Sequence, residues 1–137
     1  MSPRIDHIGV AVRRIEDHLA LYTDALGLGG AHVEEVPSEQ ARVGFVPIGE
    51  SDIELLEPTS PDSVLTRFID KRGEGVHHVA IEVDDCAAAL ARLKAQGLRT
   101  VDDAPRPGAR GTKVAFIHPS ATGGVLIELV EYGQARD

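Results

Sequence analysis

The chain has 137 residues, which is enough to bury an apolar core in one domain or in two small modules that share a core. Its formal charge of −8 argues against a nucleic-acid partner, because phosphate backbones are bound by a surplus of Lys and Arg. The single cysteine, Cys86, excludes an intramolecular disulfide and a cysteine-rich zinc site and is typical of a reducing compartment, so we expect a cytoplasmic protein. Residues 1–25 contain no uninterrupted apolar run, so we expect no signal peptide, no membrane span and no membrane partner.

The first half of the chain predicts a strand, a helix and then further strands. Residues 5–12 alternate with a period of two, which is typical of a strand. A helix follows, because apolar residues recur three or four positions apart and the pattern stops at Gly27, where a left-handed cap is expected. The residues of this apolar pattern are Ile15, Leu19, Tyr22 and Leu26. Beyond Gly27 we expect a further strand, and residues 41–46 and 52–56 predict two more.

Residues 59–75 predict a short connecting helix. The segment opens with Ser-Pro-Asp at 60–62 and closes with Gly-Glu-Gly at 73–75, which are typical start and stop signals. Its apolar residues, which we expect to face a core, are Val64, Leu65, Phe68 and Ile69.

The second half of the chain repeats the first. The matching segments are 5–12 with 76–83, 41–46 with 112–117, and 52–56 with 126–130. A second helical pattern ends at Gly97 and consists of Cys86, Ala89, Leu90 and Leu93. We therefore predict an α+β fold of two tandem β-α-β-β-β modules in a single domain, 1–137. The first module spans 1–58, the connecting helix 59–75 and the second module 76–132.

One segment of the second half departs from the strand pattern. Residues 105–111 read Pro-Arg-Pro-Gly-Ala-Arg-Gly, which is too rich in Pro and Gly for a strand. We expect a mobile or ligand-facing loop there, in the place that residues 36–40 hold in the first half.

Two histidines hold equivalent positions in the repeat. Neighbouring side chains of a strand point to opposite faces, so His7 shares a face with Gly9 and Ala11. By the same rule His78 shares a face with Ala80. These small neighbours leave space beside both imidazoles, whereas the opposite faces are apolar and suit packing against the helix that follows each strand.

Two carboxylates also hold equivalent positions. Glu54 interrupts the apolar segment 53–56, and Glu128 interrupts the apolar segment 126–130. An unpaired carboxylate in an apolar interior costs on the order of several kcal/mol, and a coordinated cation is one of the few environments that offset the lost hydration.

The four residues His7, Glu54, His78 and Glu128 provide a mixed nitrogen and oxygen set that suits cobalt, manganese, nickel, iron or zinc. Taken singly, a His at a strand start is usually a satisfied polar residue, and a Glu in an edge strand usually points to solvent. Because the same two residue types recur at matching places, we predict that pseudo-twofold packing brings all four to one divalent metal.

Other candidate residues favour structural roles. His77 has the opposite strand parity from His78, and His118 precedes Pro119 at a strand end. Cys86 lies near a helix start, where a thiol pKa can be lowered. We nevertheless predict a small core residue at this position.

These motifs resemble the methylmalonyl-CoA epimerase family of the vicinal oxygen chelate superfamily over nearly the entire chain. The segments that carry the resemblance are 6–12 (Asp-His-Ile-Gly-Val-Ala-Val), 53–58 (Ile-Glu-Leu-Leu-Glu-Pro), 73–80 (Gly-Glu-Gly-Val-His-His-Val-Ala), His118-Pro119, and 123–129 (Gly-Gly-Val-Leu-Ile-Glu-Leu). The resemblance implies paired modules whose mixed sheet forms a cup around one metal. It also implies that His7, Glu54, His78 and Glu128 are the ligands, with Co²⁺ the first choice and Mn²⁺, Ni²⁺ or Zn²⁺ as alternatives.

The resemblance further implies the reaction. In this family two bases exchange the proton on the carbon between a carboxylate and a thioester carbonyl, and a cation stabilises the enolate. A Glu-Gln pair after the second strand supplies one base, and Glu39-Gln40 matches it here. Glu128 matches the other base. The implied substrate is an acyl-CoA, namely (R)- or (S)-methylmalonyl-CoA. Because members of the superfamily commonly dimerise, the resemblance also implies a homodimer.

Two departures from the family pattern affect these expectations. The family often has Gln at the position of Glu54, so this chain adds a negative charge beside the metal. The family commonly carries Lys directly after its His-Pro, where this chain has Ser120. The CoA phosphates would then be bound by other cations, and the candidates are Arg106, Arg110 and Lys113.

Three alternatives share the fold. A glyoxalase I-type lyase acting on a thiol hemithioacetal uses the same His-Glu-His-Glu ligands, but the Glu39-Gln40 pair weighs against it. A non-catalytic protein that binds a small molecule such as an antibiotic would need no metal. A ring-cleaving dioxygenase wants two His and one carboxylate around iron, so Glu54 would crowd that site.

Overall fold

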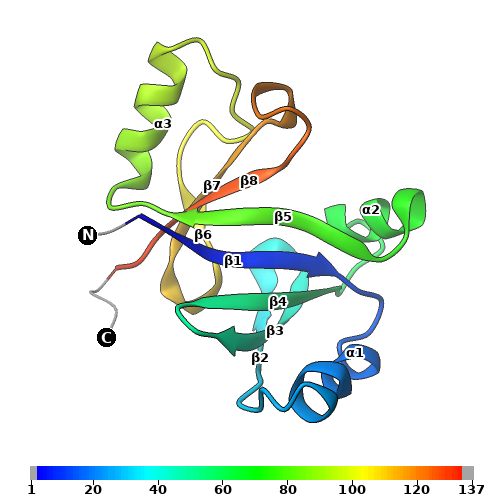
Figure 1. Cartoon of the computed structure of the whole chain (residues 1–137). Coiled ribbons are helices and arrows are strands. Elements are labelled where there is room, and N and C mark those ends of the chain that lie inside the picture. The colour runs from blue at the N-terminus through cyan, green and yellow to red at the C-terminus, as the bar shows by residue number, and fades with distance from the viewer. Residues whose placement is uncertain (1–2, 134–137) are drawn as a thin grey trace. The chain divides into compact units, whose positions relative to one another are not determined.

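The computed structural model describes residues 3–133 (Figure 1). These residues divide into two compact units, one of residues 7–77 and the other of residues 3–6 together with 78–133. The chain passes from one unit to the other inside two strands, between Asp6 and His7 and between His77 and His78. The modules predicted at 1–58 and 76–132 with a connecting segment at 59–75 stay a prediction.

The unit of residues 7–77 has the order strand, helix, strand, strand, strand, helix. Its strands are β1 (Arg4–Ala11, which begins in the other unit), β2 (His32–Val36), β3 (Ala41–Ile48) and β4 (Ser51–Pro58). Its helical segments are α1 (Glu16–Ala20), the π-helical η1 (Leu21–Ala25), the 3₁₀ turn η2 (Pro37–Glu39) and α2 (Val64–Arg72). The strands lie in the order β2-β3-β4-β1, with β1 parallel to β4 and the other pairs antiparallel.

The other unit repeats the first five elements of this order, strand, helix, strand, strand and strand. Its strands are β5 (Gly75–Glu82, which begins in the unit of residues 7–77), β6 (Arg106–Pro107), β7 (Lys113–Ile117) and β8 (Ile127–Glu131). Its helical segments are α3 (Cys86–Ala95) and the 3₁₀ turns η3 (Ala109–Gly111) and η4 (Pro119–Ala121). The strands lie in the order β5-β8-β7-β6, with β5 parallel to β8 and the other pairs antiparallel. The predicted α+β class with two β-α-β-β-β modules and mixed strand pairing is confirmed.

Local residues explain where α3 begins and where both module helices end. The α3 helix starts after Asp85, whose carboxylate accepts a hydrogen bond from the backbone N–H of Ala88 at 3.0 Å. Both predicted terminal glycines adopt left-handed conformations, with φ of 67° at Gly27 and 76° at Gly97. Within the described residues, no helix is long and apolar enough to cross a membrane.

Each module has a core between its helix and one face of its sheet. In the first, the helical residues pack on the face opposite His7, and the cluster consists of Val12, Ile15 and Leu55 with Val10, Leu19, Tyr22 and Ile53. In the second, the cluster consists of Cys86, Ala89, Leu90, Ala115, Ile117 and Leu129 with Val83, Leu93, Ala121 and Ile127. The predicted strand parity therefore holds in both modules, with the helix on one face and the His and Glu side chains on the other.

Two residues of the predicted apolar helix patterns are exposed. Leu26 is 58% exposed, because the π-helical turn η1 shifts the side chains that follow out of the α-helical phase. Val64 is 54% exposed, because the buried face of α2 is defined by Leu65 and Ile69, and Val64 lies one helical step away from it.

The expectation of a loop over residues 105–111 is wrong in part. Arg106 and Pro107 form the short strand β6, paired with Val114 and Lys113 of β7. Pro107 is tolerated because β6 lies at the end of its strand order, where a missing N–H breaks no ladder. The N–H of Gly108 then bonds to the carbonyl of Thr112 at 3.0 Å and closes the hairpin.

Candidate metal and catalytic residues

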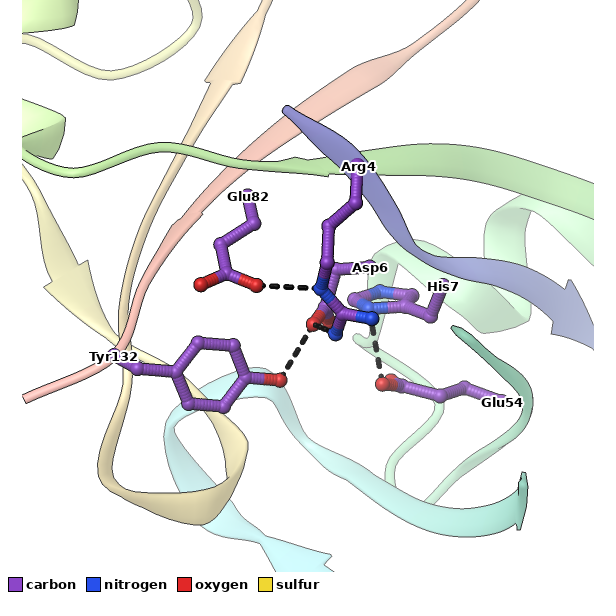
Figure 2. Close-up of polar contacts among 6 residues, drawn as sticks. All are labelled: Arg4, Asp6, His7, Glu54, Glu82 and Tyr132. Atoms are coloured by element: carbon purple, nitrogen blue, oxygen red, sulfur yellow. Dashed lines mark hydrogen bonds and ion pairs between the residues drawn. The ribbon is translucent and has the colours of Figure 1, made fainter. Parts of the chain in front are cut away.

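The first predicted pair of ligands lies within the unit of residues 7–77. Strands β1 and β4 are parallel, and their register places Gly9 opposite Glu54, so that Glu54 and His7 lie on one face. The Nδ1 atom of His7 lies 3.0 Å from Oε2 of Glu54 (Figure 2). Both side chains are buried.

The second pair repeats this arrangement in the other unit. Strands β5 and β8 are parallel, and their register places Ala80 opposite Glu128. The Nε2 atom of His78 lies 3.1 Å from Oε1 of Glu128, and both side chains are buried. In each module the residue opposite the Glu is therefore Gly or Ala, which leaves room for an imidazole and a carboxylate to meet above the strand.

Each pair also has an aromatic residue on the strand beside the Glu. Phe45 of β3 lies opposite Glu54, and Phe116 of β7 lies opposite Glu128. The ring of Phe116 meets the His78 ring edge to face, with centroids 5.6 Å apart. These apolar neighbours lower the local polarity and strengthen any electrostatic interaction that the carboxylates make.

The donor atoms of both pairs fit a divalent cation. Imidazole nitrogen and carboxylate oxygen are preferred ligands of first-row transition metals. In the described residues, His7 and Glu54, like His78 and Glu128, belong to groups of buried side chains whose ligand atoms lie within 4.8 Å of one another. Because a buried carboxylate needs a positive or hydrogen-bonding partner, each pair is suited to hold a cation or, without one, to bond internally.

The predicted base Glu39 lies in the turn between β2 and β3. It ends η2 and is half-buried, and Gln40 after it takes the left-handed conformation with φ of 52°. The turn is held by the carbonyl of Gln40, which accepts a hydrogen bond from the N–H of Thr59 at 2.9 Å. Glu39 is thus on a structured turn and is not part of a freely solvated loop.

The residues predicted to have structural roles pack against neighbours or cap a turn. The His77 ring meets Phe68 edge to face at 4.9 Å, and His118 caps η4 by accepting a hydrogen bond from the N–H of Ser120. Cys86 is fully buried, and burial first, then nearby carboxylates such as Glu131, raise the pKa of its thiol to about 11. The thiol is therefore neutral at physiological pH, in agreement with the predicted core role.

The candidate phosphate-binding cations differ in their surroundings. The Nε atom of Arg106 donates to Asp102 at 3.0 Å, and its guanidinium lies 5.2 Å above the Phe116 ring. Arg110 lies in the turn η3 with a left-handed φ of 58°, and Lys113 is exposed. Arg106 is thus held against the module, while Arg110 in the turn η3 and Lys113 at the start of β7 are exposed.

Sequence reasoning missed a largely buried polar network within the unit of residues 3–6 and 78–133. It consists of Arg4, Asp6, Glu82 and Tyr132 (Figure 2). One signal for it was present in the sequence, since Glu82 follows His78 and Ala80 at a spacing of two and so lies on the face that carries His78.

Known proteins with related sequences and structures identify the family. The family model of the Glyoxalase/Bleomycin resistance protein/Dioxygenase superfamily matches residues 6–116. The mitochondrial methylmalonyl-CoA epimerase of Mus musculus is 41% identical over 127 residues, which cover 92% of this chain and 71% of the mouse protein. The ethylmalonyl-CoA/methylmalonyl-CoA epimerase of Cereibacter sphaeroides is 35% identical over 131 residues, which cover 94% of this chain and 98% of that protein.

A solved structure gives the same result. A single-residue variant of Streptomyces coelicolor methylmalonyl-CoA epimerase, in complex with 2-nitronate-propionyl-CoA, superposes with a TM-score of 0.92 at 35% identity. The match covers 98% of this chain and 97% of that one. The chain therefore belongs to the glyoxalase/bleomycin resistance protein/dioxygenase superfamily and, within it, to the methylmalonyl-CoA epimerase family.

Proposed function

We propose that this chain is a metal-dependent epimerase that interconverts (R)- and (S)-methylmalonyl-CoA. The observation that carries the proposal is the pair of buried His-Glu contacts at equivalent positions of the two modules, 3.0 Å in one and 3.1 Å in the other. The family supports the substrate, because relatives at 35–41% identity are named as epimerases of this compound. The same relatives weigh against the glyoxalase-type and ligand-sequestering alternatives.

The proposed metal ligands are His7, Glu54, His78 and Glu128, acting on one divalent cation. Co²⁺ is the first choice, with Mn²⁺, Ni²⁺ or Zn²⁺ as alternatives. When bound, the cation would stabilise negative charge that develops on the thioester carbonyl oxygen of the substrate. The second carboxylate, Glu54, supplies charge that partly neutralises the cation. This extra charge should raise cation affinity and lower the acidity that the cation imposes.

The proposed bases are Glu39 and Glu128. Epimerisation requires one base to take the α-proton from one face of the substrate and a second acid to return a proton to the other face. Glu39 is placed on a structured turn, and Glu128 is buried on the sheet face beside His78. A carboxylate has two oxygens, so Glu128 can bind a cation through one and exchange a proton through the other.

The direct test follows the α-proton. One epimer of methylmalonyl-CoA in D₂O, with cobalt-loaded protein, should give racemisation together with uptake of deuterium at the α-carbon. A chelated sample is the control. If neither occurs in fully loaded protein, the epimerase assignment is rejected, and turnover of a thiol hemithioacetal would instead indicate a glyoxalase-type enzyme.

Three finer assignments accompany the proposal. The acyl-CoA phosphates are proposed to contact Arg110 in the turn η3 and Lys113 at the start of β7. We also propose that the protein forms a homodimer and is cytoplasmic. Sedimentation of the purified protein checks the first of these two, and fractionation of the source cells checks the second.

A further inference from the structure

Two residues near the start of the chain, one at the end of β5 and one near the C-terminus form one hydrogen-bonded network within the unit of residues 3–6 and 78–133 (Figure 2). The Nε atom of Arg4 donates to Oε1 of Glu82 at 2.6 Å. The Nη2 atom of Arg4 donates to Oδ1 of Asp6 at 2.9 Å. The same Oδ1 atom accepts a hydrogen bond from the Tyr132 hydroxyl at 2.6 Å. One guanidinium and one phenol therefore hold two carboxylates together.

The charged side chains of the network are largely shielded from solvent. Asp6 is 1% exposed and Glu82 5%, and the Arg4 side chain is 17% exposed. Burial opposes the charge on Arg4, but the hydrogen bond to Glu82 and the charge of Asp6 outweigh it, and the pKa of Arg4 is raised. Short charge-assisted bonds in a low-polarity setting are strong and directional, so the backbone carrying these side chains is held closely.

The network ends at the residue before a proposed metal ligand. Asp6 and His7 are consecutive in β1, and the division between the two compact units falls at their peptide bond. Arg4 and Asp6 thus tie the start of β1 to β5, through Glu82, and to the segment after β8, through Tyr132. The strand then continues into the unit of residues 7–77, in which His7 contacts Glu54.

We propose that Arg4, Asp6, Glu82 and Tyr132 are positioning residues that fix the start of β1 and thereby the backbone from which the His7 side chain projects. In a strand, adjacent side chains have set directions, so a fixed Asp6 sets the direction in which the His7 side chain leaves the backbone. Its effect on metal binding rests on the proposed function. The proposal that the network fixes the start of β1 does not rest on that function.

The test replaces the two tyrosines of the chain in parallel. Tyr132→Phe removes only the hydroxyl that donates to Asp6, and Tyr22→Phe makes the same change in η1, which lies outside the network. Amide exchange is measured by NMR on metal-free protein, with the β7 amides as an internal reference for global opening. Tyr132→Phe should speed exchange at the β1 amides from His7 to Val10 about tenfold relative to β7. Tyr22→Phe should not.

A second readout is cobalt affinity by visible absorption. Tyr132→Phe should weaken binding about tenfold to 100-fold, which is typical when a group that orients a ligand is lost. A lower melting temperature with unchanged β1 exchange would overturn the proposal, since the network would then be merely structural. Faster exchange with unchanged cobalt affinity would overturn the positioning of His7. If the unsubstituted protein binds no cobalt, the proposed metal site fails, and the exchange data alone still decide whether the network holds the strand.

Discussion

The two modules carry the same His-Glu pair but differ in the turn that precedes the third strand of each. Before β3 the turn presents Glu39 and then Gln40, and before β7 the equivalent turn presents Arg110 and then Gly111. Gln40 and Gly111 both take left-handed φ values, 52° and 68°, but Arg110 is left-handed as well, with φ of 58°, so the two turns share only the conformation of this second residue. At the same place one module thus offers an acid and the other a cation.

The two modules are therefore alike in their His-Glu pairs and different in the charge of their turns. The pairs on the sheet face are repeated together with a small residue opposite each Glu, which suits a centre to which both modules contribute equally. The turns have diverged in charge, which suits a substrate whose two ends differ. An acid in one turn can exchange a proton, and a cation in the other can bind phosphate.

The largest expected effect concerns the two turns. Glu39→Gln should lower the epimerisation rate about 1,000-fold, because one of two bases is lost. Exchange of the α-proton for deuterium should persist on the face served by Glu128, so exchange without racemisation is the signature. Arg110→Gln, the matched change in the other turn, should raise KM and leave kcat within about twofold. Equal losses of kcat in both variants would remove the proposed division of roles.

The next effect tests whether the two pairs serve one cation. His7→Ala and His78→Ala should each lower cobalt affinity at least about 100-fold, since losing a ligand costs more than losing the group that orients it. Titration by calorimetry on protein with a retained melting transition measures this. Two independent sites would instead leave each variant with one site of undiminished affinity.

A smaller effect concerns a second pair of equivalent glutamates, which lie three residues beyond the ligand positions. Glu57 accepts a hydrogen bond from the N–H of Ile15 at 2.9 Å, and Glu131 accepts one from the N–H of Cys86 at 2.8 Å. Each carboxylate therefore ties its strand to the start of the module helix. Glu57 also pairs with Arg42 at 3.1 Å.

Replacing these two glutamates should therefore have unequal costs. Glu131→Gln should lower the free energy of unfolding by about 1 kcal/mol and Glu57→Gln by about 2 kcal/mol, because only the second also loses an ion pair. Urea unfolding followed by circular dichroism measures both values. Equal losses would show that the Arg42 pair contributes little.

These glutamates accept hydrogen bonds from the backbone N–H groups of Ile15 in one module and Cys86 in the other. The smallest expected effect comes from the Cys86 side chain. The pKa of the Cys86 thiol is raised from 9.0 to about 11, so the folded protein holds this proton where the unfolded chain releases it. Stability from this group is complete below pH 9 and is lost as the pH rises from 9 to 11, about 1 kcal/mol of it by pH 10. Cys86→Ala should remove this part of the decline, as measured by urea unfolding at pH 8 and pH 10.

Much of the fold was predictable because its signals are local. The period-two pattern around His7 and His78 gave correct strand parity, and Gly27 and Gly97 marked both helix ends correctly. The predictions were wrong where the conformation of a residue depends on other segments of the chain or on an irregular helical turn. The strand at Arg106 depends on pairing with β7, and the exposure of Leu26 depends on a π-helical turn that no local pattern announced.

By itself, the sequence determined the module order, the faces of the strands and the residue types able to bind a cation, since these follow from periodicity and from the cost of burying charge. Only the tertiary structure decided that Gly9 lies opposite Glu54 and Ala80 opposite Glu128, because register depends on hydrogen bonding between strands that are distant in the chain. It also decided that Arg4 and Asp6 bond to Glu82 and Tyr132. Such a network joins residues more than 70 positions apart, and no local pattern can specify it.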